Sequence, residues 1–353
     1  MLNNKNEENA INQLLKRYYL REDLQKEFPE VRYGDYQRLI EWAVGVTFRT
    51  ITDDDYDELY GFRDIYTKLK SKTLVTWNPL SENKEAILER KLVWIFGSPR
   101  SGSTWLSTQL LKHPDNIIWD EPYIGVHFNV NRLYQIERED YIFSTRKKMY
   151  WLPALRKFIL ACAYAHSKTI RKNLIIKEPN GSEIADIILE CLPNSKLIFL
   201  LRDGRDVVDS LVDAHQSNSW NPDLSSIPLT NQKIRNQKIE EHSIVWKCLT
   251  EITRNAFEIH PPQLRLLIKY EDLLKNTLWE VKRIYQFLQI KIDDDNLEKI
   301  IDRYSFDEIP QSEKGSGKFY RFATPGLWKE HFSGEEKQLM ESIMGKVLKK
   351  LDY

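Results

Sequence analysis

KLVWIFGSPRSGSTWLST, residues Lys91–Thr108, is the stretch that decides the fold of this chain. It opens with an unbroken apolar run, Leu92–Phe96, which predicts a β-strand buried on both faces. Gly97 and Gly102 enclose a short loop, and the apolar spacing that follows predicts a helix. Because a helix N-terminus presents unpaired N–H groups and partial positive charge, the loop is expected to bind a phosphate-like anion.

The loop differs from the phosphate-binding loop of nucleotide kinases and NTPases, which reads G-x-x-x-x-G-K-[ST]. Ser103 occupies the position of the lysine, and the one cation in the loop is Arg100. No acidic residue that would hold Mg²⁺ can be recognised downstream. Since those enzymes need the lysine and Mg²⁺ at the β- and γ-phosphates, this loop is better suited to a donor without a γ-phosphate.

The composition is that of a soluble globular protein. Of 353 residues, 41% are apolar and 29% are charged, and 52 basic residues balance 52 acidic ones. This balance gives no overall attraction to nucleic acid or to an anionic membrane. The apolar runs are far shorter than the roughly 20 residues that span a bilayer, and the N-terminus does not resemble a signal peptide. We therefore expect a cytoplasmic protein with neither a nucleic-acid nor a membrane partner; the sequence does not predict the oligomeric state.

The cysteines and histidines give no sign of a metal site or a disulfide. Three widely spaced cysteines, Cys162, Cys191 and Cys248, predict buried free thiols. The seven histidines form none of the paired spacings typical of zinc ligands, so no metal is expected.

The order of the predicted helices and strands along the chain indicates two parts. In residues 1–88 the apolar positions have helical spacing, which indicates a helical N-terminal extension: either a cap packed on the main domain or a surface for the acceptor or a partner. In residues 89–353 strands alternate with helices, which predicts an α/β domain: a P-loop NTPase-like, three-layer fold with a central parallel sheet. Further strands are predicted at residues 174–176, 196–201 and 264–268.

Polar clusters follow three of the predicted strands: Gly97–Thr104, Lys177–Gly181 and Arg202–Asp206. The carboxyl ends of parallel strands meet at one edge of a sheet, which is where ligands bind in such folds. The sequence therefore predicts that the three clusters converge on one ligand.

These clusters, together with a C-terminal stretch, resemble the sulfotransferase family that uses 3′-phosphoadenosine 5′-phosphosulfate (PAPS). Ser98–Trp105 is similar to the family loop that holds the 5′-phosphosulfate. Arg202 and Ser210, eight residues apart, resemble the pair that reaches the 3′-phosphate. Arg321–Lys329 resembles the third motif, R-K-G-x-x-G-x-W-K.

The resemblance implies a set of donor contacts and two departures from the family pattern. Phe322 and Ala323 replace the lysine and glycine of the third motif, so Arg321 is expected to carry more of the 3′-phosphate contact. Tyr270 resembles a tyrosine near the adenosine, and Phe306 an aromatic residue that sandwiches the adenine. The implied donor-binding residues are Arg100, Ser101, Gly102, Ser103, Thr104, Trp105, Arg202, Ser210, Tyr270, Phe306, Arg321, Phe322 and Ala323.

The resemblance also implies the chemistry, in which a sulfuryl group passes in line from PAPS to an acceptor oxygen or nitrogen, leaving adenosine 3′,5′-bisphosphate (PAP). Catalysis then depends on positioning and on stabilising charge, for which Arg100 and Lys177 are the candidate cations. The histidine that follows the lysine in cytosolic members is absent here, and Glu121 lies where other members have a glutamate base. The alternative bases are Asp120, His127 and Glu178.

The acceptor is the least determined part of the prediction. Residues 120–170 are rich in aromatic side chains and residues 215–237 are polar, and both are assigned to the acceptor side. A small soluble metabolite or natural product is expected, and a saccharide is the alternative. The competing functions are a P-loop nucleotide kinase and a catalytically silent protein that binds a 3′,5′-bisphosphate.

Overall fold

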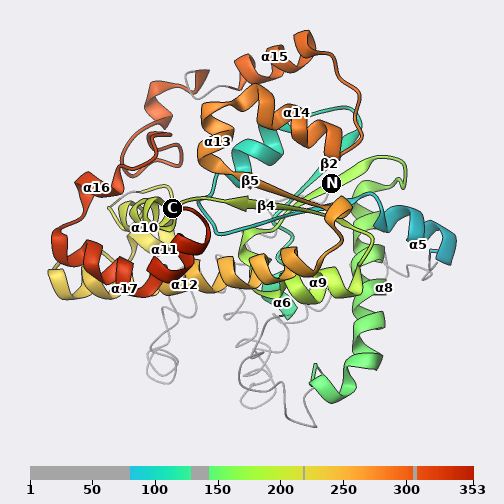
Figure 1. Ribbon diagram of the computed structural model, residues 1–353, viewed down its shortest axis with the longest axis horizontal. Helices are drawn as coiled ribbons and strands as arrows, with labels where there is room; N and C mark the ends of the chain where they lie inside the picture. The colour runs from blue at the N-terminus through green and yellow to red at the C-terminus, as the bar shows by residue number, and fades with distance from the viewer. Residues whose placement is uncertain (1–79, 129–142, 218, 305–307) are drawn as a thin grey trace, which may run out of the picture. The chain divides into compact units, whose positions relative to one another are not determined.

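The computed structural model describes residues 80–128, 143–217, 219–304 and 308–353 (Figure 1). The chain divides into two units, Met1–Asn78 and Pro79–Tyr353, and the description below concerns the second. Most of the predicted N-terminal extension, residues 1–88, lies outside the described residues, so its boundary stays a prediction.

The described part of the chain is built on a five-stranded sheet in which every pair of neighbours is parallel. The strand order β2-β3-β1-β4-β5 places β1 at the centre, which explains its unbroken apolar sequence. The strands are β1 (Leu92–Phe96), β2 (Asn116–Asp120), β3 (Asn173–Lys177), β4 (Lys196–Leu201) and β5 (Arg265–Lys269). The predicted α/β fold with a central parallel sheet is confirmed.

Helices connect the strands in the described ranges. The α-helices are α5 (Glu82–Glu89), α6 (Ile124–Phe128), α8 (Lys148–Ser167), α9 (Ala185–Cys191), α10 (Gly204–Asp213), α11 (Pro222–Ser225), α12 (Gln232–Ile259), α13 (Tyr270–Lys275), α14 (Thr277–Phe287), α15 (Asp294–Arg303), α16 (Trp328–His331) and α17 (Gly334–Lys350). A π-helix, η1, spans Trp105–Leu110, and the short 3₁₀ helices are η2 (Thr145–Lys147), η3 (Pro179–Ile184), η4 (Pro262–Leu264) and η6 (Gln311–Glu313).

The two faces of the sheet pack against different helices, which makes three layers (Figure 1). Alternate side chains of a strand point to opposite faces. Accordingly, Val93 and Ile95 pack with η1, α14 and α15, whereas Trp94 and Phe96 pack with α5, α8 and α9. The latter face continues over β4, where α10, α12 and α17 cover Phe199. This arrangement leaves the carboxyl ends of the strands as one common edge.

Two sequence interpretations need correction. The aromatic segment 120–170 contains α8, a 20-residue helix whose Ile159 and Leu160 are fully buried in the core, so much of it is not an acceptor loop. The polar segment 215–237 overlaps α12, which begins at Gln232 and runs for 28 residues.

All three cysteines of the chain are free thiols, as predicted. Cys191 is buried, Cys162 is half-buried and Cys248 is exposed, so the expectation of burial is confirmed for Cys191 and wrong for Cys248. In the described ranges, no helix has both the length and the apolar character to cross a membrane.

Candidate active site

A cavity of about 580 Å³ lies at the edge of the sheet where the strands end. The loop after β1, the residues that follow β2 and β4, the first residue of α13 and the segment 319–324 all contribute to its walls. Sequence-predicted residues in the lining are Arg100, Gly102, Ser103, Thr104, Trp105, Glu121, Arg202, Ser210, Tyr270, Arg321, Phe322 and Ala323. Ser101 and Lys177 are buried beside it, and Phe306 lies outside the described residues.

Close packing fixes the path of the loop after β1. A Cβ atom on Gly97 would lie 2.1 Å from the carbonyl oxygen of Leu200, so no larger residue fits. The Ser182 hydroxyl accepts a hydrogen bond from the Gly97 amide at 2.9 Å and donates one to the Gly97 carbonyl at 2.8 Å. Gly102 has φ +88°, and a Cβ there would lie 2.6 Å from the Tyr270 ring. The two glycines therefore let the loop approach β4 and Tyr270 closely.

The side chain of Arg100 extends from this loop towards α10. Its Nε donates to Ser210 Oγ at 3.0 Å and its Nη2 donates to the Phe319 carbonyl at 2.7 Å. The guanidinium carbon lies 4.5 Å from the Trp220 ring centroid and 4.8 Å from that of Phe319. Burial, reinforced by two neighbouring arginines, lowers the pKa of Arg100 to about 10, so the group is still charged at neutral pH. Sequence reasoning missed both aromatic residues.

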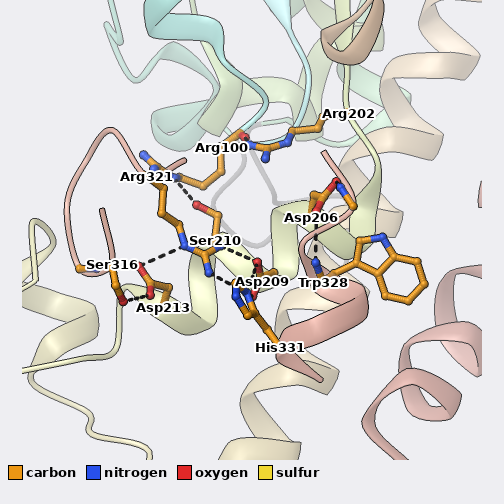
Figure 2. A network of polar contacts seen from close by, with 12 residues as sticks. Arg100, Arg202, Asp206, Asp209, Ser210, Asp213, Ser316, Arg321, Trp328 and His331 are labelled. Atoms are coloured by element: carbon orange, nitrogen blue, oxygen red, sulfur yellow. Dashed lines mark hydrogen bonds and ion pairs between the residues drawn. The ribbon is translucent and has the colours of Figure 1, made fainter. Parts of the chain in front are cut away.

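Two further arginines lie around the same cavity (Figure 2). Arg202 donates from Nη1 to the Arg100 carbonyl at 2.7 Å and lies over the Tyr270 ring at 4.6 Å. Arg321 donates from Nη1 to Asp209 Oδ2 at 2.6 Å. The Nε atom of Arg202 is buried and has no hydrogen-bond partner in the described part of the chain, whereas Nε of Arg321 forms an ion pair with Asp213 Oδ2 at 3.4 Å. The cavity wall therefore holds one buried guanidinium donor, Arg202 Nε, that the described residues do not satisfy.

Aspartates on one side of α10 hold the C-terminal motif in place (Figure 2). Asp206 accepts a hydrogen bond from the Gly326 amide at 2.8 Å. Asp209 pairs with Arg321 and also lies 3.0 Å from Nδ1 of His331. These contacts fix the segment that carries the third motif against the helix that carries Ser210.

Asp213 completes this set. Its carboxylate accepts hydrogen bonds from the Ser316 hydroxyl at 2.5 Å and from the Gly317 amide at 2.7 Å. Sequence reasoning included Asp206 in a predicted polar cluster but missed Asp209 and Asp213, although the i, i+3, i+7 spacing of the three places them along one face of a helix.

A second polar cluster lies at the ends of β2 and β3. The Lys177 ammonium donates to Thr104 Oγ1 at 3.0 Å and forms ion pairs with Asp120 at 2.9 Å and Glu121 at 2.8 Å. Asn180 donates to the other Glu121 oxygen at 3.1 Å. The structure thus joins the predicted lysine and the predicted base, and Thr104 links both to the loop after β1.

The alternative bases are less well placed than Glu121. Glu178 is completely buried and does not line the cavity, and burial raises its pKa to about 7. Asp120 contacts Lys177 but is absent from the cavity lining. The side chain of His127 lies outside the described part of the structure. Among Asp120, Glu121 and Glu178, only Glu121 lines the cavity.

The remaining predicted residues border the cavity near Tyr270 and the third motif. The rings of Trp105 and Tyr270 meet edge to face, with centroids 6.4 Å apart. Ala323, which replaces the family glycine, has φ +47° and so keeps the left-handed conformation that glycine favours. Phe322 is 39% exposed and lies over Arg321, 5.4 Å from ring centroid to guanidinium carbon.

Comparison with known proteins identifies the family. The sulfotransferase domain family matches residues 90–352, which cover the sheet, the cavity and all three motifs. This chain belongs to the sulfotransferase family. Within the described residues of this sulfotransferase, no group of three or more His, Cys, Asp or Glu side chains is arranged to hold a metal ion.

Individual relatives are distant. Human sulfotransferase 1C2 is 22% identical over 163 residues, which cover 42% of this chain and 53% of that protein. A protein-tyrosine sulfotransferase of Drosophila melanogaster is 24% identical over 210 residues, 58% of this chain and 39% of that protein. The chain thus spans about half or less of the length of these relatives. The structure of mouse sulfotransferase SULT7A1 complexed with PAP aligns with a TM-score of 0.48 and 16% identity, covering 77% of this chain and 94% of that one.

Proposed function

We propose that this sulfotransferase moves the sulfuryl group of PAPS to a hydroxyl or amine of a small soluble acceptor and leaves PAP. The observation that carries the proposal is the buried, unsatisfied Nε donor of Arg202 at a cavity that Arg321 and Ser210 also line. A buried donor without an acceptor costs free energy, so such groups mark the place of a missing partner. Phosphate oxygens suit forked arginine donors better than neutral acceptors do.

In this proposal the residues of the three motifs bind different parts of PAPS. The loop from Ser98 to Thr104 receives the 5′-phosphosulfate, and Arg202, Ser210 and Arg321 receive the 3′-phosphate. Tyr270 and Trp105 border the adenosine. For Arg100 to reach the bridging oxygen, its guanidinium group leaves the Ser210 hydroxyl. That hydroxyl accepts from Arg100 and so keeps its own hydrogen to donate to the 3′-phosphate.

The transfer step needs charge stabilisation and a proton acceptor. The acceptor oxygen or nitrogen forms a bond to sulfur while the bond from sulfur to the bridging oxygen breaks, and the electron pair stays on the leaving PAP. Lys177 and Arg100 stabilise the charge that develops on the bridging and sulfonate oxygens. Glu121, which contacts Lys177 and faces the cavity, accepts the proton of the attacking group.

The cavity supports a compact acceptor. Beyond the arginines its wall contains Trp220, Leu224 and Val245, with Asn180 and Tyr123 near Glu121. In this part of the wall apolar side chains lie beside a few polar groups, as is typical of sites for small organic molecules. It is less suited to a long hydrophilic saccharide.

The direct test is an acceptor screen with PAPS labelled with ³⁵S in the sulfuryl group, followed by mass spectrometry of the products. Phenols, alcohols and amines with one or two rings are expected to accept the label, ahead of oligosaccharides and tyrosyl peptides. Transfer of phosphate from Mg-ATP in place of sulfuryl transfer would establish the kinase alternative. Binding of PAP with no transfer to any acceptor would establish the catalytically silent one.

A further inference from the structure

Two histidines with no part in the steps above meet at the wall of the same cavity. His215 follows α10 and His242 belongs to α12, and their Nε2 atoms are 3.1 Å apart. His215 is 2% exposed, and its Nδ1 lies 2.9 Å from the carbonyl oxygen of Ile227. His242 lines the cavity. The pair therefore connects the Ile227 carbonyl group to the space where an acceptor would bind.

The contacts assign the hydrogens of the neutral pair. A carbonyl oxygen only accepts hydrogen bonds, so His215 carries its hydrogen on Nδ1. Its Nε2 is then unprotonated and accepts a hydrogen bond from Nε2–H of His242. Nδ1 of His242 is consequently left with an unshared electron pair, and no described residue donates to it.

His242 stays neutral at physiological pH. Burial, followed by His215 and Lys238, lowers the pKa of His242 to about 4, and the opposing attraction of Glu241 is weaker. A group that binds a proton only near pH 4 is a poor general base, because an effective base has a pKa near the working pH. Nδ1 is thus a permanent hydrogen-bond acceptor and not a competitor of Glu121.

The residues around Nδ1 of His242 determine which molecules can form a hydrogen bond to it. Leu224, Val245 and Trp220, which contribute to the same cavity, are largely or wholly apolar. We propose that Nδ1 of His242 accepts a hydrogen bond from a second hydroxyl or N–H group of the acceptor molecule. The preferred acceptors are then compact molecules with two donor groups joined by an apolar body, one group being sulfated and the other bound by His242. This inference rests on the proposed sulfotransferase function.

Two substitutions test the roles of the two ring nitrogens of His242 independently. In His242→Gln the amide can still reach His215 from a position near Nε2, but nothing replaces Nδ1. In His242→Asn the side-chain oxygen lies near the position of Nδ1, but the contact with His215 is lost. A purely structural role predicts that asparagine is the more damaging change, whereas the proposed role predicts that glutamine is.

The probes are 2-naphthol and its 1,5-, 2,6- and 2,7-dihydroxy counterparts, assayed with PAPS and also titrated calorimetrically into the PAP complex. With the unaltered protein, at least one diol is expected to exceed 2-naphthol by about tenfold in kcat/KM and in affinity, as one hydrogen bond allows. His242→Gln should abolish that ratio, His242→Asn should retain part of it, and neither should change the affinity for PAP. A ratio that survives in His242→Gln, or that is absent from the unaltered protein, overturns the proposal.

A measurement without any substrate tests the premise. In protein labelled with ¹⁵N in its histidines, Nδ1 of His242 should show the shift of an unprotonated imidazole nitrogen at neutral pH. A protonated Nδ1 overturns the inference even where PAPS is a good donor. Conversely, absence of a preference for PAP over 5′-AMP refutes the proposed function without altering this spectrum, so the two failures are distinguishable.

Discussion

Replacing Gly102 by alanine should damage the donor site in two ways. At φ +88° a side chain strains the backbone, which costs about 1–2 kcal/mol. The added Cβ would also lie 2.6 Å and 2.7 Å from two ring carbons of Tyr270, and overpacking of this kind typically costs about 1–3 kcal/mol. The sum is a loss of roughly 2–5 kcal/mol in the free energy of unfolding. At about 2–4 °C per kcal/mol, Tm should fall by roughly 4–20 °C.

Gly326→Ala is the matched control. Gly326 has φ +90°, but a Cβ there has no neighbour within 4 Å, so only the backbone strain applies. Urea unfolding of both variants should therefore show Gly102→Ala to be the less stable by about 1–3 kcal/mol. Because Tyr270 lies against Arg202, Gly102→Ala should also weaken PAP binding measured by calorimetry. Equal destabilisation by the two substitutions would refute the proposed packing of the loop on Tyr270.

Three other predictions follow from the site. Burial raises the pKa of Glu178 to about 7 from its ordinary value of 4.5. Between these two pH values the folded protein keeps a proton that the unfolded chain has lost, so the free energy of unfolding should fall by about 3 kcal/mol as pH rises from 4.5 to 7. Urea unfolding across this range should show that Glu178→Gln removes the slope, and a retained slope would assign it to another group. Glu121→Gln should lower kcat by about 10²-fold or more with little change in the Kd of PAP, as loss of a general base does, whereas Asp120→Asn should change kcat only a few-fold; near-normal turnover of the Glu121 variant would exclude that residue. Ala323→Gly should relieve left-handed strain and stabilise the protein by up to about 1 kcal/mol, and a loss of stability in urea would contradict the assignment of strain.

The sequence was most informative where burial is complete. β1, β3 and β4 are buried along their whole lengths, so their apolar runs could be recognised without structural information. β2 was missed because its five residues are half-buried or exposed at the edge of the sheet, which leaves a weaker pattern. α8 was misread because exposed side chains such as Met149 and Tyr150, 73% and 72% exposed, obscure its apolar face.

The candidate site shows the same limit. The Gly97–Thr104, Lys177–Gly181 and Arg202–Asp206 clusters could be brought together from the sequence because each follows a parallel strand, whereas Arg321 was placed only by the family resemblance. The environment of Arg100 could not, since Trp220 and Phe319 come from segments far apart in the chain and neither belongs to a motif. Which way a long side chain turns is decided by such tertiary contacts, and local sequence carries no record of them.

The measurement that tests the central claim most directly is a calorimetric comparison of PAP with 5′-AMP, which differ only in the 3′-phosphate. Two charge-assisted contacts at about 1.5–3 kcal/mol each predict that PAP binds at least about 10²-fold more tightly. Arg202→Ala should remove most of this preference. Arg205→Ala should preserve it, because Arg205 pairs with Asp203 and does not line the cavity. Equal affinities of the unaltered protein for the two nucleotides would contradict the assignment of the 3′-phosphate site.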